Sequence, residues 1–553
     1  MNKNNVNEIS NEKSLYIKIL QKNPNNYEAL LKLGLIDIKE NNYSYAKDKF
    51  NKLIQINKKK YEAHLNLSNL FFLEGDIVKA NNILKNYIDN IEENLEIINS
   101  LAINFFNSNN FKNLETHISK YINNFQSHIL YYLKGFLLLQ TEEVYKSENF
   151  FKKSMMLNAS FWNNYDFLLN QYEKQSRLED FKFLFKTAKK NFKNNIKLSY
   201  YESLYLYRKK KYKDSLDILV NKEYKKKFLS AQSDSDSADY LHLLSRVYEK
   251  LGFYNESYNL ALDRNKTILN FNDNKRFKKE MLIDIIDTYK NFFKKNKPVS
   301  ARTEDGIKHS NLTFIIGFPR SGTTLLDTIL RSHSKTMLLE EKPYILDIRH
   351  NFYKNHELAD ILSISNHEKI QMQKKYINSF EYKADKIIID KYPLNLIELG
   401  FIKTIFPKAK IVLAIRHPLD CIISCVMTSF KMNEAMVNFE DEKTTAHFYN
   451  ECFDLLFKYF NFYKIDYLEV KYENVVSNFK NEINNLLKYL NLDFEENINN
   501  FHKTAMLREN INTPSYDQVT QPIYFSSINR YKNFDEIKKI KGEVSYWIKK
   551  FSY

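Results

Sequence analysis

Residues 312–324, LTFIIGFPRSGTT, set the fold expected of the C-terminal half of the chain. The first seven are mostly apolar and rich in strand-forming types, so they predict a buried strand. The strand runs directly into the loop Gly317-Phe-Pro-Arg-Ser-Gly-Thr-Thr324, and the helical stretch LLDTILRSH follows. A strand, a tight glycine loop and a helix N-terminus together place backbone N–H groups around an anion such as phosphate.

This loop departs from an ATP-binding loop at one position. Its spacing, Gly317-x4-Gly322, matches a Walker A loop, but Thr323 stands where that loop has lysine. The missing lysine counts against a P-loop kinase or nucleotidase, which is the first alternative for the function.

Strands and helices alternate beyond the loop, as they do in a parallel sheet with crossover helices, so the C-terminal half is expected to be α/β. Ligands of such sheets gather at the carboxyl ends of the strands. We therefore expect Arg320, Lys391 and Arg416 to point into one crevice. The further β-rich runs are KIIID (386–390), KIVLAI (410–415) and DYLEVKY (466–472).

The N-terminal half is expected to be nearly all helical, because eight of the nine prolines lie at or after Pro298. Small residues recur there at a 34-residue period, as Gly34 and Ser68 do. Each precedes a position on the next helix by 12 residues, as Ser68 precedes Ala80. The pattern resembles tetratricopeptide repeats, whose small residues let the two helices of a unit cross closely.

The predicted organisation is an α-solenoid followed by an α/β domain with a central parallel sheet. About seven tetratricopeptide units are expected over residues 1–295, then a linker over 296–311 that is marked by Pro, Ser and Gly. The P-loop-like domain occupies residues 312–553.

Composition excludes several classes of protein. Hydrophobic residues make up 43% and aromatic residues 15%, too much for a disordered chain. No apolar run approaches the roughly 20 residues of a membrane-spanning helix, and the first ten residues carry no secretory signal, so a cytoplasmic protein is expected. The three cysteines lack metal-site or disulfide spacing and are expected as buried free thiols.

The net charge of +16 favours anionic partners. Much of the surplus is lysine scattered beside asparagine and isoleucine, which points to composition bias rather than to a binding face. No nucleic-acid partner is predicted.

The run PRSGTTL after a hydrophobic strand resembles the 5′-phosphosulfate loop of sulfotransferases, and the whole chain resembles a bacterial arrangement of that family with tetratricopeptide repeats in front. The resemblance covers roughly residues 312–535. It implies the sulfuryl donor PAPS (3′-phosphoadenosine 5′-phosphosulfate), the product 3′,5′-ADP, and no metal. The implied 5′-phosphosulfate ligands are Arg320, Ser321, Gly322, Thr323 and Thr324.

Four further motifs match the family in order. Arg416 ends a strand and Ser424 follows it by eight residues, so both side chains can converge on one phosphate. The resemblance gives that pair the 3′-phosphate, and it gives Lys391 the bridging oxygen of the leaving phosphate, although Asp390 replaces the family's Asn. It also implies that Tyr472 lies near the adenine. The last motif, PSYDQVTQP (514–522), is similar to one in tyrosylprotein sulfotransferases and implies that Ser515 assists the leaving group.

Transfer to a hydroxyl requires a base within hydrogen-bond reach of the acceptor. Glu340 and Glu341 end the second strand, and an ungapped count from Pro319 puts Glu341 at the position of the catalytic Glu in the tyrosylprotein and bacterial members. His333 closes the helix after the loop, where it is better explained as a helix cap.

The predicted activity is therefore PAPS-dependent sulfuryl transfer to a hydroxyl, with protein tyrosine as one acceptor and a polysaccharide or lipid hydroxyl as the alternative. A polypeptide or extended glycan is expected to bind the concave face of the repeats, while oligomerisation through the repeats is an equal alternative. A non-enzymatic repeat protein with a decayed nucleotide domain is the remaining possibility, and the retained Glu341, Lys391, Arg416 and Ser424 argue against it.

Overall fold

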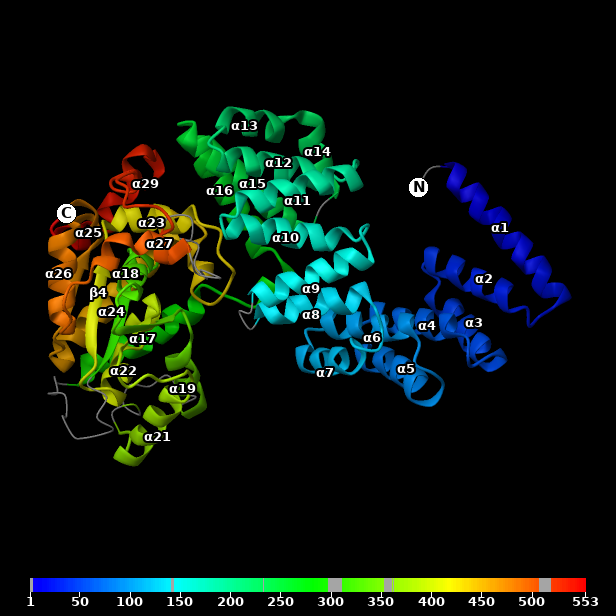
Figure 1. Cartoon of the computed structure of the whole chain (residues 1–553), viewed down its shortest axis with the longest axis horizontal. Coiled ribbons are helices and arrows are strands. Elements are labelled where there is room, and N and C mark those ends of the chain that lie inside the picture. Colours follow the sequence, from blue (N-terminus) through cyan, green and yellow to red (C-terminus); the bar gives the residue numbers. More distant parts are fainter. Residues whose placement is uncertain are drawn as a thin grey trace. The chain divides into compact units, whose positions relative to one another are not determined.

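The computed structural model describes residues 3–140, 144–231, 233–296, 311–352, 361, 363–506 and 519–553 (Figure 1). The chain divides into two compact units. Unit 1 consists of Met1–Gln171 and Thr187–Lys193, and unit 2 of Tyr172–Lys186 and Asn194–Tyr553. The division falls within the helical repeats, whereas most of the predicted linker, residues 297–310, lies outside the described residues.

The N-terminal half is a helical repeat region, as the sequence predicts. In the part of the chain that the structure describes, seven pairs of consecutive helices lie between Tyr27 and Leu269. They are α2 (Tyr27–Lys39) with α3 (Tyr43–Ile56), α4 (Tyr61–Leu73) with α5 (Ile77–Asn90), α6 (Leu95–Asn107) with α7 (Phe111–Tyr121), α8 (His128–Gln140) with α9 (Val144–Leu157), α10 (Trp162–Lys174) with α11 (Leu178–Asn191), α12 (Lys197–Arg208) with α13 (Tyr212–Val220), and α15 (Asp234–Lys250) with α16 (Tyr254–Leu269). Helices α1 (Lys3–Lys22), α14 (Lys222–Ala231) and α17 (Glu280–Lys295) stand outside these pairs.

The 12-residue offset marks the place where the two helices of a pair cross closely. Ser68 Oγ donates a hydrogen bond to the carbonyl of Ala80 at 2.9 Å. In the first pair, glycine stands at the position of Ser68, and the ring of Phe50 fills the space that a side chain would take. A Cβ at Gly34 would lie 2.7 Å from that ring. The same kind of hydrogen bond recurs at Ser147–Gly135, Ser203–Ser215 and Ser245–Ser257. The 12-residue offset in the sequence thus corresponds to a packing contact between the two helices of a pair.

The C-terminal half contains a five-stranded, all-parallel sheet in the order β2-β3-β1-β4-β5. The strands are β1 (Leu312–Gly317), β2 (Thr336–Glu340), β3 (Ile387–Lys391), β4 (Lys410–Ile415) and β5 (Leu468–Lys471). The fold class predicted from the sequence is therefore confirmed. One detail differs: Tyr472 was expected inside the last strand, but it begins helix α25 (Tyr472–Ser477) instead.

Helices cover both faces of this sheet. Alternate residues of β1 enter different hydrophobic clusters, Phe314 and Ile316 one and Ile315 the other, as expected of a parallel sheet buried on both sides. The covering helices include α18 (Thr323–Arg331), α19 (Tyr344–Phe352), α21 (Asn366–Ile377), α22 (Leu399–Ile405), α23 (Pro418–Val426), α24 (Glu442–Tyr463), α26 (Phe479–Leu490) and α27 (Phe501–Met506).

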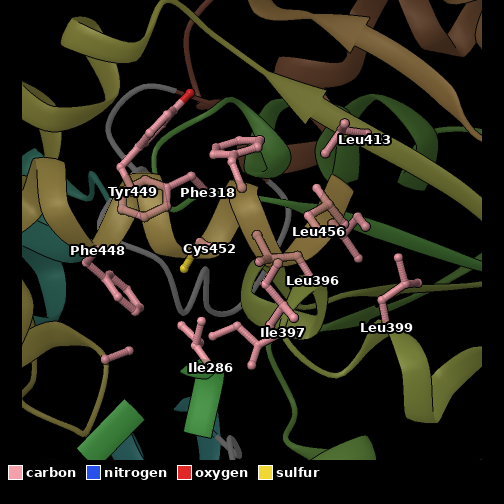
Figure 2. Packing of buried hydrophobic residues seen from close by; sticks show 14 of the residues in the cluster. Ile286, Phe318, Leu396, Ile397, Leu399, Leu413, Phe448, Tyr449, Cys452 and Leu456 are labelled. Carbon is pink, nitrogen blue, oxygen red and sulfur yellow. The ribbon is translucent and has the colours of Figure 1, made fainter. Parts of the chain in front are cut away.

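The larger cluster also takes in side chains from the last two helices before the sheet, α16 of the last repeat pair and α17 after it. Tyr258 and Ala261 of α16 and Ile286 and Tyr289 of α17 are buried in it together with the sheet residues. Figure 2 shows Ile286 in the same packed region as Leu396 and Cys452. The end of the repeat region therefore shares a hydrophobic core with the α/β domain.

The cysteines and the apolar helices can be compared directly with what composition predicts. Cys421, Cys425 and Cys452 are all buried free thiols, as predicted. Across the described residues, none of the helices combines the length and the apolar character needed to cross a membrane.

Candidate active site

The loop after β1 is shaped by its two glycines. Gly317 faces the neighbouring strand so closely that a Cβ there would lie 2.5 Å from the carbonyl oxygen of Ala414. Gly322 has a φ of 99°, a left-handed conformation that disfavours other residues, and a Cβ there would lie 2.9 Å from the ring of Tyr472. Helix α18 begins at the next residue, Thr323. The loop therefore brings backbone and helix N-terminus together as the sequence predicts.

Hydrogen-bond donors at the start of α18 favour an anion as the ligand. The first N–H groups of a helix have no partner within the helix, and here they belong to Thr323 and Thr324. Ser321 Oγ is buried and has no hydrogen-bond partner among the described residues. A buried hydroxyl without a partner is costly, so the cradle is chemically suited to a ligand that accepts hydrogen bonds.

Arg320 and Ser424 meet at the same edge of the sheet, although they are 104 residues apart. Arg320 Nε donates to Ser424 Oγ at 2.9 Å. Burial lowers the pKa of Arg320, and the nearby guanidinium groups of Arg416 and Arg530 lower it further. Crowded cations of this kind are stabilised by a negatively charged ligand.

Arg416, the residue after β4, is nearly buried beside Arg320. Its Nη1 donates to the carbonyl of Arg320 at 3.3 Å, and its Nη2 donates to that of Ser527 at 2.5 Å. The guanidinium lies over the ring of Tyr472, 4.9 Å from the centroid. Its Nε is buried without a hydrogen-bond partner. One face of Arg416 therefore retains a donor for a ligand.

Lys391 connects two strand ends through Glu341. The ammonium is completely buried and donates to Glu341 Oε1 at 2.7 Å, while Glu340 Oε1 lies 3.7 Å away. The Glu341 N–H in turn donates to the carbonyl of Lys391 at 2.9 Å. The side chain of Glu341 is 29% exposed, whereas that of Glu340 is 10% exposed. Of the two carboxylates, Glu341 is the more accessible.

A third carboxyl, that of Asp390, belongs to the residue before Lys391. Asp390 is buried, accepts a hydrogen bond from the Tyr376 hydroxyl at 2.7 Å, and accepts another from Asn395 Nδ2 at 3.3 Å. Burial raises the pKa of Asp390 to about 7, against the opposing effects of the Tyr376 hydrogen bond and the Lys391 charge.

A pocket opens above these strand ends, and most of the predicted residues line it. Ser321, Lys391 and Ser424 lie behind its wall, where Lys391 reaches it through Glu341 and Ser424 through Arg320. The predicted Ser515 lies outside the described residues. The predicted residues in the wall are Arg320, Gly322, Thr323, Thr324, Glu341, Arg416 and Tyr472.

Two parts of the wall were not anticipated. Phe430, Asn433 and Met436 come from the segment after α23, and no sequence motif marked them. The other part is Ile523, Tyr524 and Ser527, which follow directly after the motif 514–522 that contains Ser515; the apolar run Pro522-Ile-Tyr524 at the end of that motif is the signal that could have identified it.

His333 is buried away from this wall, with Nε2 2.9 Å from the carbonyl oxygen of Asp493. No three His, Cys, Asp or Glu side chains among the described residues come together as a metal site requires. Transfer without a metal stays a prediction.

Comparison with known proteins gives a family match over the same part of the chain. Residues 313–496 match the model of the sulfotransferase family, a range that includes every described candidate residue from Arg320 to Tyr472. An uncharacterized protein of Aquifex aeolicus is 26% identical over 235 residues, which make up 40% of this chain and 30% of that protein. The chain therefore spans less than a third of the length of that curated relative.

Two solved structures align with part of the chain. The sulfotransferase domain of the olefin synthase of Synechococcus PCC 7002 aligns over 46% of this chain and 99% of its own, with 18% identity and a TM-score of 0.33. A tetratricopeptide repeat protein of Parabacteroides merdae aligns over 45% of this chain and 96% of its own, with 12% identity and a TM-score of 0.34.

Proposed function

We propose that this protein transfers the sulfuryl group of PAPS to a hydroxyl acceptor and releases 3′,5′-ADP, because its residues 313–496 match the model of the sulfotransferase family. The proposal is carried by two buried donors at the carboxyl edge of the sheet, Ser321 Oγ in the loop after β1 and Arg416 Nε in the pocket wall. Neither has a hydrogen-bond partner among the residues that the structure describes. Two separate donor groups suit a ligand with phosphates at two positions.

In this proposal the loop holds the 5′-phosphosulfate and the Arg416 side the 3′-phosphate. Ser321, Thr323 and Thr324 supply hydroxyl and backbone donors from the loop, and Arg320 adds charge. Arg416 contributes its free Nε and Ser424 its hydroxyl. Tyr472, which lies under the Arg416 guanidinium, is placed to contact the nucleotide base.

The chemistry proposed for Glu341 and Lys391 uses their direct hydrogen bond. Glu341 takes the proton of the acceptor hydroxyl as the acceptor oxygen bonds to sulfur and the bond from sulfur to the bridging phosphate oxygen breaks. Lys391 donates a hydrogen bond to that departing oxygen, and 3′,5′-ADP leaves. Protonation of Glu341 weakens its hold on Lys391 at the moment when the ammonium is needed by the leaving group. Ser515 is proposed to assist there from its sequence motif alone.

The wall of the pocket supports a phenolic acceptor over a polysaccharide. Tyr392, Leu394, Phe430 and Met436 line the same pocket as Glu341. A saccharide carries a hydroxyl on most carbons, and burying those groups against apolar side chains costs free energy. An aromatic ring that carries one hydroxyl fits better, so we propose a tyrosyl side chain of a polypeptide, with a glycan or lipid hydroxyl as the alternative.

Calorimetry with 3′,5′-ADP and ADP tests the donor site. The first nucleotide should bind much more tightly, because ADP lacks the 3′-phosphate that Arg416 and Ser424 are proposed to hold. Arg416→Ala should weaken 3′,5′-ADP binding by about 10- to 150-fold, the effect of losing a charge-assisted contact of about 1.5–3 kcal/mol, and should change ADP binding much less. Equal affinity of the unaltered protein for the two nucleotides would contradict the two-phosphate site.

The acceptor is tested by mass spectrometry. Cell extract is incubated with the protein and isotopically labelled PAPS, and the labelled products are identified. Label on peptide tyrosines supports the proposed acceptor, whereas label on glycan or lipid alone refutes it.

A further inference from the structure

We propose that the last repeat helices complete the donor site, with Glu249 of α15 and Arg264 of α16 as positioning residues. Glu249 holds the segment Ser527–Tyr531 against the pocket, and Arg264 holds the end of α23, the helix that carries Ser424. The inference rests on the proposed function, because it concerns the affinity of the same nucleotide pocket.

Glu249 makes a two-point ion pair with Arg530. Its Oε1 lies 2.6 Å from Arg530 Nε, and its Oε2 lies 2.7 Å from Arg530 Nη2. Paired contacts of this type fix orientation as well as distance. Burial favours the neutral acid, but the Arg530 charge outweighs it and lowers the pKa of Glu249. The contact therefore ties a repeat helix to the segment beside the pocket.

The residues around Arg530 show what this tie positions. Ser527, in the pocket wall, accepts the hydrogen bond from Arg416 Nη2. Asn529 and Tyr531 donate their backbone N–H groups to the two carboxylate oxygens of Asp420, each at 2.8 Å. Asp420 lies in the first turn of α23. A shift of Arg530 would thus move the carbonyl that orients Arg416.

Arg264 acts on the other end of α23. It is fully buried and donates to the carbonyls of Val426, Met427 and Thr428 at 2.7, 3.0 and 3.2 Å. The last carbonyls of a helix have no partner within the helix and carry partial negative charge, so a guanidinium is a suitable cap. Ser424 lies two residues before Val426, which makes its position sensitive to this cap.

The sign of one substitution separates positioning from simple electrostatics. Glu249→Gln removes a negative charge from the surroundings of a pocket proposed to bind an anion, so Coulomb forces alone predict tighter binding of 3′,5′-ADP. Loss of the Arg530 anchor predicts weaker binding. We expect the full-length variant to bind 3′,5′-ADP about 2- to 30-fold more weakly. Binding of ADP, which does not engage Arg416 in the proposed site, should change less.

Lys290→Gln is the matched control. Lys290, on α17, pairs with Glu451 of α24 at 2.5 Å, so it also joins a helix that precedes the sheet to the α/β domain, but neither residue lines the pocket. Its substitution should leave both nucleotide affinities unchanged. Arg264→Lys keeps the charge but loses the planar fork that reaches three carbonyls, and it should weaken 3′,5′-ADP binding as Glu249→Gln does.

Three outcomes would overturn the inference. Unchanged or tighter binding by Glu249→Gln would show that the anchor does not position the pocket. An equal loss in Lys290→Gln would show general loosening of the packing instead. If Glu249→Gln lowered kcat and left the KM for PAPS unchanged, these residues would not position the donor site. If the unaltered protein fails to bind 3′,5′-ADP, the proposed function itself is wrong.

Discussion

Two neighbouring glutamates share one buried lysine, yet they differ in access to the pocket. Glu341 lines it, while Glu340 is the more buried of the two. General base catalysis typically contributes about 10²- to 10⁴-fold to a rate. We expect Glu341→Gln to lower turnover by that order while 3′,5′-ADP affinity, measured by calorimetry, stays nearly constant.

Glu340→Gln is the natural control for this experiment, because it makes the same chemical change one residue away. It should affect turnover much less. The reverse order of the two variants would mean that the ungapped count from Pro319 is wrong by one position.

Asp390 should make stability depend on pH. Its pKa of about 7 in the folded protein lies above the ordinary value of 3.8, so the folded state binds this proton more tightly than the unfolded state does. The resulting stabilisation is complete below about pH 4 and is lost as pH rises through 7. Relative to Asp390→Asn, the unaltered protein should lose up to about 1.4 kcal/mol of unfolding free energy per pH unit over that interval.

Urea unfolding of both proteins at pH 5 and pH 7.5 measures that difference. Asn keeps the acceptor for the Tyr376 hydroxyl but has no carboxyl to titrate. A stability gap that does not change between the two pH values would show that Asp390 keeps an ordinary pKa.

The positions of individual site residues could be predicted from the sequence where a motif follows a strand. Arg320, Arg416 and Glu341 could be placed together because the carboxyl ends of parallel strands share one edge. Glu249 and Ser527 could not, since they act through partners about 280 and 110 residues away, and neither sits in a recognisable pattern. Contacts of that kind depend on how elements pack.

Among the elements, the loop between β1 and α18 depends most on one residue. Alanine at Gly322 would have to adopt a φ of 99°, and its Cβ would displace Tyr472. The left-handed conformation costs about 1–2 kcal/mol for a residue with a Cβ. Gly322→Ala should therefore lower the free energy of unfolding by at least that amount and weaken 3′,5′-ADP binding.

Gly542→Ala provides the comparison, because a Cβ there would meet nothing within 4 Å and its φ is ordinary. Calorimetry and urea unfolding should find this second variant close to the unaltered protein. If the two alanine variants behaved alike, the loop conformation would not be the source of the effect.

The elements themselves were largely predictable. The 12-residue offset identified the helix crossings because it reports a steric contact, a small residue against a neighbouring helix. The polar run near residue 235 interrupts the 34-residue period; the structure places α14 before this run and makes the run the first turns of α15. Insertions carry no period, so their structure is set by local packing that a repeat pattern does not contain.

For the whole molecule, the proline distribution predicts a boundary near Pro298 between a helical half and an α/β half. The hydrophobic core does not stop at that boundary. Tyr258 of α16 and Ile286 of α17, both before the sheet in sequence, are buried in the same cluster as the sheet. Tyr289 also donates a hydrogen bond to the buried Glu398, which Arg349 of α19 contacts at 3.0 Å. A chain cut near Ser310 would leave these groups without their partners, and we expect it to bind 3′,5′-ADP weakly or to fail to fold.

A chain that begins at Asn194 gives the sharper test of what the repeats do. It retains α12 to α17 and nearly all of unit 2, so it should keep 3′,5′-ADP affinity. It lacks the repeats before α12, whose stacked helices are proposed to grip an extended polypeptide. On that proposal, sulfation of a short tyrosine peptide should be preserved, while the KM for the native acceptor rises. If the shortened chain sulfated the native acceptor with full efficiency, oligomerisation would remain as the role of those repeats. Sedimentation of the two proteins would then show the full-length chain as an oligomer, with a larger mass difference from the shortened chain than the missing residues account for.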